Sequence, residues 1–174
     1  MFMKNKRWVS FDTSLGINAF GTPTVDVFFS YCDKKEKTGS FCKNCQNSVM
    51  QKDGVGFLLS LEEIFEIIEK KYNFMYDIYN KCEIAIMGGE PLAEINRKFT
   101  QEIAKKYDTV VYTWRMPKDL KNIDTSMFKK IVCGEYIEEL NVGDDYVLGS
   151  TNQIVVDGNL ELILEYKKTG DDIE

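Results

Sequence analysis

Four short apolar runs, rich in β-branched and aromatic residues, constrain the fold of this chain most strongly. They occupy residues 25–31, 82–87, 109–114 and 128–133. Runs of this length, bounded by turn residues, are typical of buried strands. Helical segments separate the first three runs, and strands that alternate with helices form right-handed crossovers. The pattern therefore predicts an α/β fold with mostly parallel strands covered by helices.

Two intervening segments have helical periodicity. The first begins at Ser60, which has Glu63 three residues later in the spacing of a capping box. Its apolar residues recur at helical spacing to about Tyr72. The second helix is predicted over residues 92–107.

The carboxy-terminal part of the chain follows a different pattern. Two apolar runs within residues 154–164 flank Asp157 and Gly158, which predicts a β-hairpin. Residues 170–174 are expected to form a frayed acidic tail. A length of 174 residues is enough for one substantial core but short for two ordinary domains, so we expect a single domain with its core at about residues 25–166.

Charge and hydropathy exclude several classes of function. The net charge is -6 and the pI is near 4.9, so the chain has no basic surplus for nucleic acid or anionic lipid. No apolar run approaches the roughly 20 residues that span a bilayer, and residues 1–7 lack the apolar stretch of a signal peptide. We expect a cytoplasmic protein whose partner is a protein or a small molecule.

The chain contains no histidine, which excludes Ser/His/Asp and Cys/His catalysis and every metal site that needs imidazole. It does contain five cysteines. In a cytoplasmic protein an odd number of cysteines indicates thiols or metal ligands rather than disulfides.

Three of the cysteines lie close together after the first predicted strand. Cys32, Cys42 and Cys45 form a C-x9-C-x2-C pattern, and the charged residues 33–40 between them are expected to form an exposed loop. The C-x2-C half is a common chelating unit. Three thiolates without a histidine would leave an iron–sulfur cluster with one iron open to a substrate.

A structural zinc site is the alternative for these cysteines, and it requires a fourth protein ligand. Cys82 begins its predicted strand, at the opposite edge from the loop. Cys133 lies near the far end of its own strand and stays open as a neighbour, although its default interpretation is a small buried residue.

A second motif, from Gly88 to Pro91, follows the strand at residues 82–87. Glycines let a backbone approach a ligand closely, a carboxylate such as Glu90 accepts hydrogen bonds from an ammonium group, and Pro91 suits the first turn of the next helix. Active sites of such sheets lie at the carboxyl ends of the strands, where both motifs fall.

The order and strand contexts of the two motifs resemble the radical S-adenosylmethionine enzymes, which are built on a partial (β/α) barrel. The resemblance implies that Cys32, Cys42 and Cys45 hold a [4Fe-4S] cluster whose open iron chelates S-adenosylmethionine. It also implies that the turn from Gly88 to Pro91 lies against the methionine moiety, with Gly89 and Glu90 among the contacts.

The finer resemblance, over residues 26–154, is to the activases of anaerobic ribonucleotide reductases. It rests on the short length, on residues 45–47 and on the Gly-Ser-x-Asn-Gln element at residues 149–153. The remaining expected cofactor contacts are these residues: Asn44, Thr113, Ser150, Asn152 and Gln153. The family usually has C-x3-C-x2-C, so this chain carries six extra residues in an exposed loop, where growth costs little entropy.

The resemblance implies that S-adenosylmethionine is cleaved reductively to methionine and a 5'-deoxyadenosyl radical, which abstracts hydrogen from a glycine Cα of the reductase. No catalytic side chain is expected beyond the cluster. A flavodoxin-like protein or another donor would supply electrons. The alternatives are a radical enzyme acting on another protein or a small molecule, a zinc-stabilised binding module, and a homologue that has lost catalysis.

Overall fold

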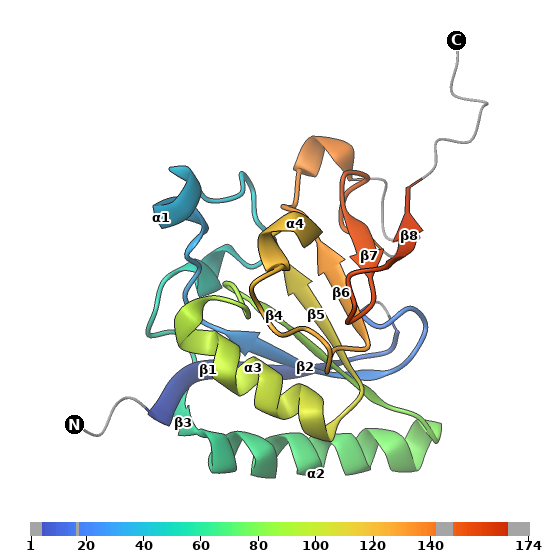
Figure 1. Ribbon diagram of the computed structural model, residues 1–174. Helices are drawn as coiled ribbons and strands as arrows, with labels where there is room; N and C mark the ends of the chain where they lie inside the picture. The colour runs from blue at the N-terminus through green and yellow to red at the C-terminus, as the bar shows by residue number, and fades with distance from the viewer. Residues whose placement is uncertain (1–4, 17, 142–147, 167–174) are drawn as a thin grey trace.

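An eight-stranded sheet forms the centre of the computed structural model of the protein, which describes residues 5–16, 18–141 and 148–166 (Figure 1). The strand order is β3-β1-β2-β4-β5-β6-β7-β8. The strands are β1 (Lys6–Ser14), β2 (Thr24–Phe29), β3 (Phe57–Ser60), β4 (Glu83–Gly88), β5 (Thr109–Thr113), β6 (Lys130–Cys133), β7 (Ile154–Val156) and β8 (Leu162–Glu165). The helices are α1 (Lys34–Thr38), α2 (Leu61–Tyr79), α3 (Glu94–Lys106) and α4 (Pro117–Leu120), with 3-10 turns η2 (Ser48–Gln51) and η3 (Glu138–Leu140).

The sheet is mixed, with a parallel centre and antiparallel flanks. The neighbours β2, β4, β5 and β6 pair in parallel, as the four apolar runs predict. On one flank β1 pairs antiparallel with β2 and β3, and on the other β7 pairs antiparallel with β6 and β8. The α/β class and the carboxy-terminal hairpin are confirmed. The prediction of mostly parallel strands is wrong, because four of the seven pairs are antiparallel.

The difference comes mainly from β1 and β3, which the sequence pattern does not reveal. In β1 only Val9 is fully buried, and Ser10 separates it from Phe11, so the strand lacks a continuous apolar run. The four residues of β3 are too few to show a period of two, and Phe57 is 66% exposed. Both strands owe their conformation to backbone pairing on the flank of the sheet rather than to their own apolar pattern.

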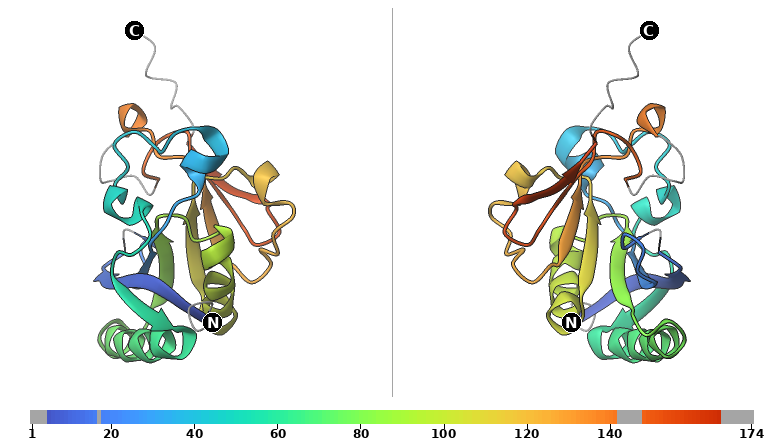
Figure 2. Two further views of the ribbon diagram at one scale, coloured as in Figure 1. Left: turned by 90° about the vertical axis from the view of Figure 1, so that its left-hand side faces the viewer. Right: turned by 90° about the vertical axis from the view of Figure 1, so that its right-hand side faces the viewer.

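The two long helices pack on the same face of the sheet (Figures 1 and 2). The capping box of α2 is present, with the Ser60 hydroxyl accepting from the Glu63 backbone and the Glu63 carboxylate accepting from the Ser60 backbone. The helix α2 continues seven residues beyond its predicted end near Tyr72, whereas α3 lies within its predicted range of 92–107. The main core lies between their apolar stripes and the inward side chains of β2, β4, β5 and β6.

The opposite face of the sheet carries a smaller core and no long helix among the described residues. It consists of Ala19, Val110, Val132, Leu148 and Val155. Loops rather than helices therefore cover this side, which leaves room for a cavity near the ends of the parallel strands.

The carboxyl ends of the parallel strands meet at one end of the molecule. In Figure 1 the arrowheads of β5 and β6 point towards the top of the view, where α1 lies. The prediction of an exposed loop over residues 33–40 is wrong in part: α1 forms there, and Asp33 and Lys34 are buried. The predicted acidic tail at residues 170–174 lies outside the described residues. No helix in the described parts of the chain is long and apolar enough to cross a membrane.

Candidate iron–sulfur site

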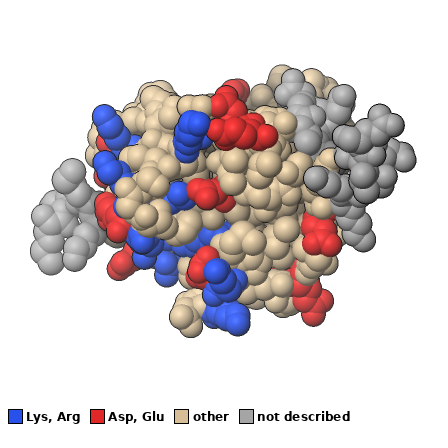
Figure 3. Space-filling model, turned by 90° about the horizontal axis from the view of Figure 1, so that it is seen from above, with Lys and Arg blue, Asp and Glu red and all other residues tan. Residues whose placement is uncertain are grey.

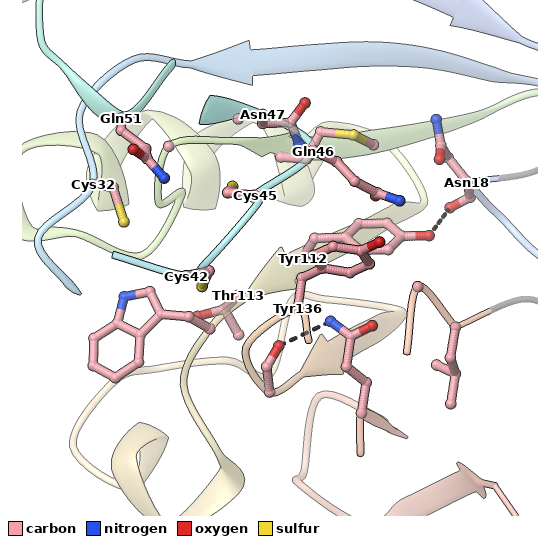
Figure 4. Close-up of a pocket in the computed structure, with 18 of the residues that line it drawn as sticks. Asn18, Cys32, Cys42, Cys45, Gln46, Asn47, Gln51, Tyr112, Thr113 and Tyr136 are labelled. Atoms are coloured by element: carbon pink, nitrogen blue, oxygen red, sulfur yellow. Dashed lines mark hydrogen bonds between the residues drawn. The ribbon is translucent and has the colours of Figure 1, made fainter. Parts of the chain in front are cut away.

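The carboxyl ends of the parallel strands border a cavity of about 190 Å³. Cys32, Cys42 and Cys45 all line it, together with Gly88 and Gly89. Figure 4 shows the three labelled cysteines towards one side of the cavity and Asn18 at the other. A single bound water needs only about 10–15 Å³, so this space accommodates a group much larger than one ion or water. The structure thus brings the cysteine motif and the glycine turn to one site.

Cys32 is fixed by the backbone on both sides of it. The preceding Tyr31 adopts φ 81°, and its N–H donates to the Met50 carbonyl at 2.8 Å. The Cys32 N–H donates to the Gln51 carbonyl at 3.0 Å. The Cys32 sulfur accepts the backbone N–H of Lys34. Cys32 is only 8% exposed, so the first thiol of the motif has a defined position at the wall of the cavity.

Cys42 and Cys45 are half-buried and lie farther from the core. The Cys42 sulfur accepts the backbone N–H of Tyr136, which follows β6. The intervening Lys43 pairs with Glu139 at 2.7 Å. Asn44 has φ 51° and donates to the Glu138 carboxylate, so its side chain points away from the cavity. The C-x2-C half of the motif is therefore held against residues 134–140.

The state of the thiols follows from their burial. Burial raises the pKa of the Cys32 thiol to about 12 and also raises the pKa of the Cys42 thiol. Both groups are neutral near pH 7 without a metal. Metal or cluster binding requires the thiolate and displaces the proton, and N–H donors stabilise the sulfur charge that results.

Gly88 and Gly89 are required by close packing of the chain itself. Gly88 has φ +112°, and a Cβ there would collide with the backbone of Phe29. A Cβ on Gly89 would collide with the Tyr31 carbonyl and lie 2.6 Å from the Met50 carbonyl oxygen. The Gly89 N–H donates to the Phe29 carbonyl at 2.7 Å. These glycines therefore let the turn lie directly against the segment that carries Cys32, in addition to lining the cavity.

Glu90 is turned into the protein interior and does not line the cavity. The residue is 0% exposed, and its carboxylate accepts from the Thr113 hydroxyl at 2.9 Å and from the backbone N–H of Leu92 at 2.9 Å and of Trp114 at 3.2 Å. Pro91 lies in the turn before α3, not in its first helical turn as predicted, because the helix begins at Glu94. The structure thus assigns Glu90 internal partners where the sequence predicts a cofactor contact.

A buried ionic triad links Glu90 to the residue after the first cysteine. Arg115 is 4% exposed and contacts Glu90 at 3.0 Å and Asp33 at 2.5 Å. The Trp114 indole N–H also donates to Asp33, at 3.2 Å. One guanidinium faces two carboxylates, and burial raises the pKa of Glu90 to about 7 although Arg115 opposes the shift. The triad ties the glycine turn, the end of β5 and the cysteine segment together.

Asn96, on α3, makes a further connection that the sequence analysis does not identify. Its side-chain amide donates to the carbonyls of Ser30 and Glu90 at 3.1 and 3.0 Å, and its oxygen accepts from Arg7 at 2.9 Å. Asn96 occupies the buried stripe of α3, in helical register with Phe99 and Ile103. A lone amide on an apolar helix face is the signal that could have indicated this role.

The other predicted cofactor contacts divide into two groups. Thr113 and Gln153 line the cavity. Gln153 already donates to the Gly134 carbonyl at 2.9 Å and accepts from the Ser150 N–H at 3.1 Å. Ser150 accepts from the Ile137 N–H, and Asn152 donates to the Glu135 carbonyl. The Gly-Ser-x-Asn-Gln element therefore braces residues 134–137, and of its polar side chains only Gln153 reaches the cavity.

The lining of the cavity carries no Lys, Arg, Asp or Glu among the described residues. Away from the cysteines it consists mainly of amides and aromatic rings, including Asn18, Gln46, Gln51, Tyr112 and Tyr136. The Tyr112 hydroxyl donates to the Asn18 carbonyl at 3.1 Å. Figure 3 looks onto this end of the molecule and shows most of the visible Lys and Arg side chains on its left-hand part and an uncharged area to the right of its centre. The described lining therefore offers hydrogen bonds but no cationic side chain to a phosphate.

The donor set gives little support to a single-ion site. In the described residues no three Cys, Asp or Glu side chains converge tightly enough to hold one metal ion. Cys82 and Cys133 are buried and do not belong to the described lining of the cavity. A tetrahedral zinc site would need four ligands at about 2.0–2.3 Å from one point. Three thiols on one side of a cavity, two of them with N–H donors, fit the ligand set of a larger cluster.

Comparison with known proteins agrees with this donor set. Neither the curated proteins nor the solved structures include a match to the chain. A family model described as a 4Fe-4S single cluster domain matches residues 21–161, which include the three cysteines, the glycine turn and the first strand of the hairpin. The chain therefore belongs to the 4Fe-4S single cluster domain family.

Proposed function

We propose that this protein is a radical S-adenosylmethionine activase. It would cleave S-adenosylmethionine reductively and use the 5'-deoxyadenosyl radical to generate a glycyl radical on an anaerobic ribonucleotide reductase. The observation that carries the proposal is the meeting of Cys32, Cys42 and Cys45 with Gly88 and Gly89 at one cavity. The family match supports the [4Fe-4S] cluster, and the parallel centre of the sheet supports the radical S-adenosylmethionine type of partial barrel.

The residues of the proposed site would have different roles. Cys32, Cys42 and Cys45 would hold the cluster, which when bound supplies the electron that cleaves the sulfonium bond. Gly88 and Gly89 would leave backbone surface open to S-adenosylmethionine. Glu90 would act through its partners, since its carboxylate holds Thr113 and Arg115 rather than facing the cavity.

The lining of the cavity supports a polypeptide as the second substrate. Described side chains such as Asn18, Gln46 and Gln51 offer amide donors and acceptors without charge. Such groups match the N–H and C=O groups of an extended backbone segment, and they offer no positive charge to the phosphates of a free nucleotide. The proposed partner is thus a glycine-bearing segment of the reductase, with a flavodoxin-like protein or another donor as the reductant.

Anaerobic reconstitution tests the chemistry. The protein is loaded with iron and sulfide, reduced with dithionite and mixed with S-adenosylmethionine, and 5'-deoxyadenosine is measured. We expect a brown protein that forms this product. Cys42→Ala and Cys45→Ala should abolish it, whereas Cys82→Ala, a buried cysteine away from the cavity, should leave it. A colourless protein that binds zinc and forms no product would refute the proposal.

The partner is tested separately. The loaded protein is incubated with S-adenosylmethionine, dithionite and the large subunit of an anaerobic ribonucleotide reductase from the same organism. We expect the electron paramagnetic resonance doublet of a glycyl radical on that subunit. Formation of 5'-deoxyadenosine without a glycyl radical would keep the radical chemistry and reassign the substrate.

A further inference from the structure

Lys34 is a buried lysine two residues after Cys32. It lies within the nine residues between Cys32 and Cys42. Although α1 is a short surface helix, Lys34 is only 6% exposed, while the next residue, Lys35, is exposed. A buried ammonium at the base of an exposed helix requires an explanation, because burial of a charge is costly unless it is compensated.

Two features place Lys34 beside the thiols. Its backbone N–H donates to the Cys32 sulfur. Its ammonium lies 3.4 Å from the carbonyl of Ser40, two residues before Cys42, and its charge opposes the rise in the pKa of the Cys42 thiol that burial causes. One residue thus presents a hydrogen bond to one proposed cluster ligand and a positive charge to another.

The ammonium of Lys34 is held in place by two acceptors. It pairs with Glu135 at 2.8 Å and lies 3.4 Å from the Ser40 carbonyl. Glu135 is 43% exposed and is followed by Tyr136, whose N–H donates to the Cys42 sulfur. The positive member of the pair is therefore the buried one, and the negative member is partly screened by water.

We propose that Lys34 sets the reduction potential of the cluster by placing a buried positive charge, paired with Glu135, beside its thiolate ligands. The inference rests on the proposed function, since it concerns the [4Fe-4S] cluster of the same site. Reduction adds a negative charge to a cluster, and nearby charges, hydrogen bonds to the sulfurs and solvent exposure determine its potential. A buried cation stabilises the reduced form and makes the potential less negative.

The midpoint potential of the reconstituted protein, measured by a redox titration followed by electron paramagnetic resonance, tests the inference. Lys34→Met should shift the potential to a more negative value, because the cation is lost and Glu135 is left unpaired. Glu135→Gln should shift it to a less negative value, because the cation loses its counter-charge. Lys34→Arg keeps the charge and should stay closer to the wild type than Lys34→Met. The matched control is Lys35→Met, an exposed lysine on the same helix, which should leave the potential nearly unchanged.

The outcomes separate this inference from the proposed function. A wild-type protein that takes up no iron would overturn both. A wild-type protein that holds the cluster and forms 5'-deoxyadenosine, with equal potentials in Lys34→Met and Lys35→Met, would overturn only the role of Lys34. If Lys34→Met fails to hold a cluster, Lys34→Gln is titrated in its place: a more negative potential supports the inference, and an unchanged or less negative one overturns it.

Discussion

The first cysteine of the motif and the pair that follows are held by different kinds of structure. Cys32 emerges directly from a central strand, and its neighbour Asp33 is tied through Arg115 to the buried Glu90. The Cys42–Cys45 pair is held at the surface, where Lys43 pairs with Glu139 and both side chains are more than half exposed. Buried ion pairs are costly to break, whereas exposed ones contribute little. The comparison indicates that one side of the site is part of the core and the other is a surface segment docked onto it.

Removal of the Arg115 guanidinium, on the buried side of the site, should have the largest effect on stability. Arg115→Met leaves Glu90 and Asp33 without their shared counter-charge, so we expect the free energy of unfolding to fall by about 3–5 kcal/mol. Urea denaturation of the reduced, cluster-free protein measures it. The control Arg97→Met loses hydrogen bonds to the Leu92 carbonyl but isolates no buried carboxylate, and should cost about 0.5–1.5 kcal/mol. Equal losses in the two variants would remove the distinction between core and surface.

A methyl group at Gly89 should disturb the buried side of the site, because it would crowd the backbone beside Cys32. Gly89→Ala pushes against the carbonyls of Tyr31 and Met50, which set the position of Cys32. We expect a loss of about 1–3 kcal/mol and a reduced iron content after reconstitution. Gly39→Ala, where a Cβ meets nothing within 4 Å, should keep the iron content of the wild type despite its left-handed φ. Full iron content in Gly89→Ala would show that the turn tolerates displacement.

The pH dependence of stability sharpens the description of the buried triad. The pKa of Glu90 is raised to about 7 by burial, above its ordinary value of 4.5, so folding favours the protonated form. The stability that the protonated Glu90 gives to the folded state is fully present below about pH 4.5 and is lost as the pH rises through 7. The stability of the wild type relative to Glu90→Gln should therefore decrease between pH 5 and pH 8, as followed by urea denaturation at each pH. An increase over this range would mean that Arg115 outweighs burial and that the charged form is the stabilising one.

The smallest effect is expected on the surface side. Lys43→Ala removes the exposed pair with Glu139, so stability in urea should change little at physiological salt. Iron content should also stay at the wild-type level, because the Tyr136 N–H still meets the Cys42 sulfur. A large loss of stability or iron would show that the surface pair fixes the cysteines as firmly as the core does.

The sequence predicts the strands and helices around Cys32 better than the long-range contacts that join them. The strands β2, β4, β5 and β6 follow from short runs rich in apolar residues, and α2 follows from its capping box. The meeting of the cysteine segment with the glycine turn follows from the rule that parallel strands share one carboxyl edge. These features are local in sequence or follow from topology alone.

What the sequence does not predict depends on pairs distant along the chain. Arg115 and Asp33 are separated by 82 residues, and no local pattern distinguishes this arginine from a surface one. Glu90 has the residue type of a cofactor contact, yet Thr113 and Arg115 engage it within the protein. Lys34 stands among exposed charges in a polar segment, and its burial becomes visible only once Glu135 lies opposite it.

The shape of α1 bears on how the spacing between the first two cysteines can vary. The Lys34 ammonium reaches the Ser40 carbonyl, the Thr38 hydroxyl donates to the Lys34 carbonyl, and the Gly39 N–H donates to the Lys35 carbonyl. The segment from Lys34 to Ser40 thus satisfies part of its own hydrogen bonding. These residues form a helical turn between the first two cysteines. A loop of this kind tolerates changes in length at a small cost in entropy.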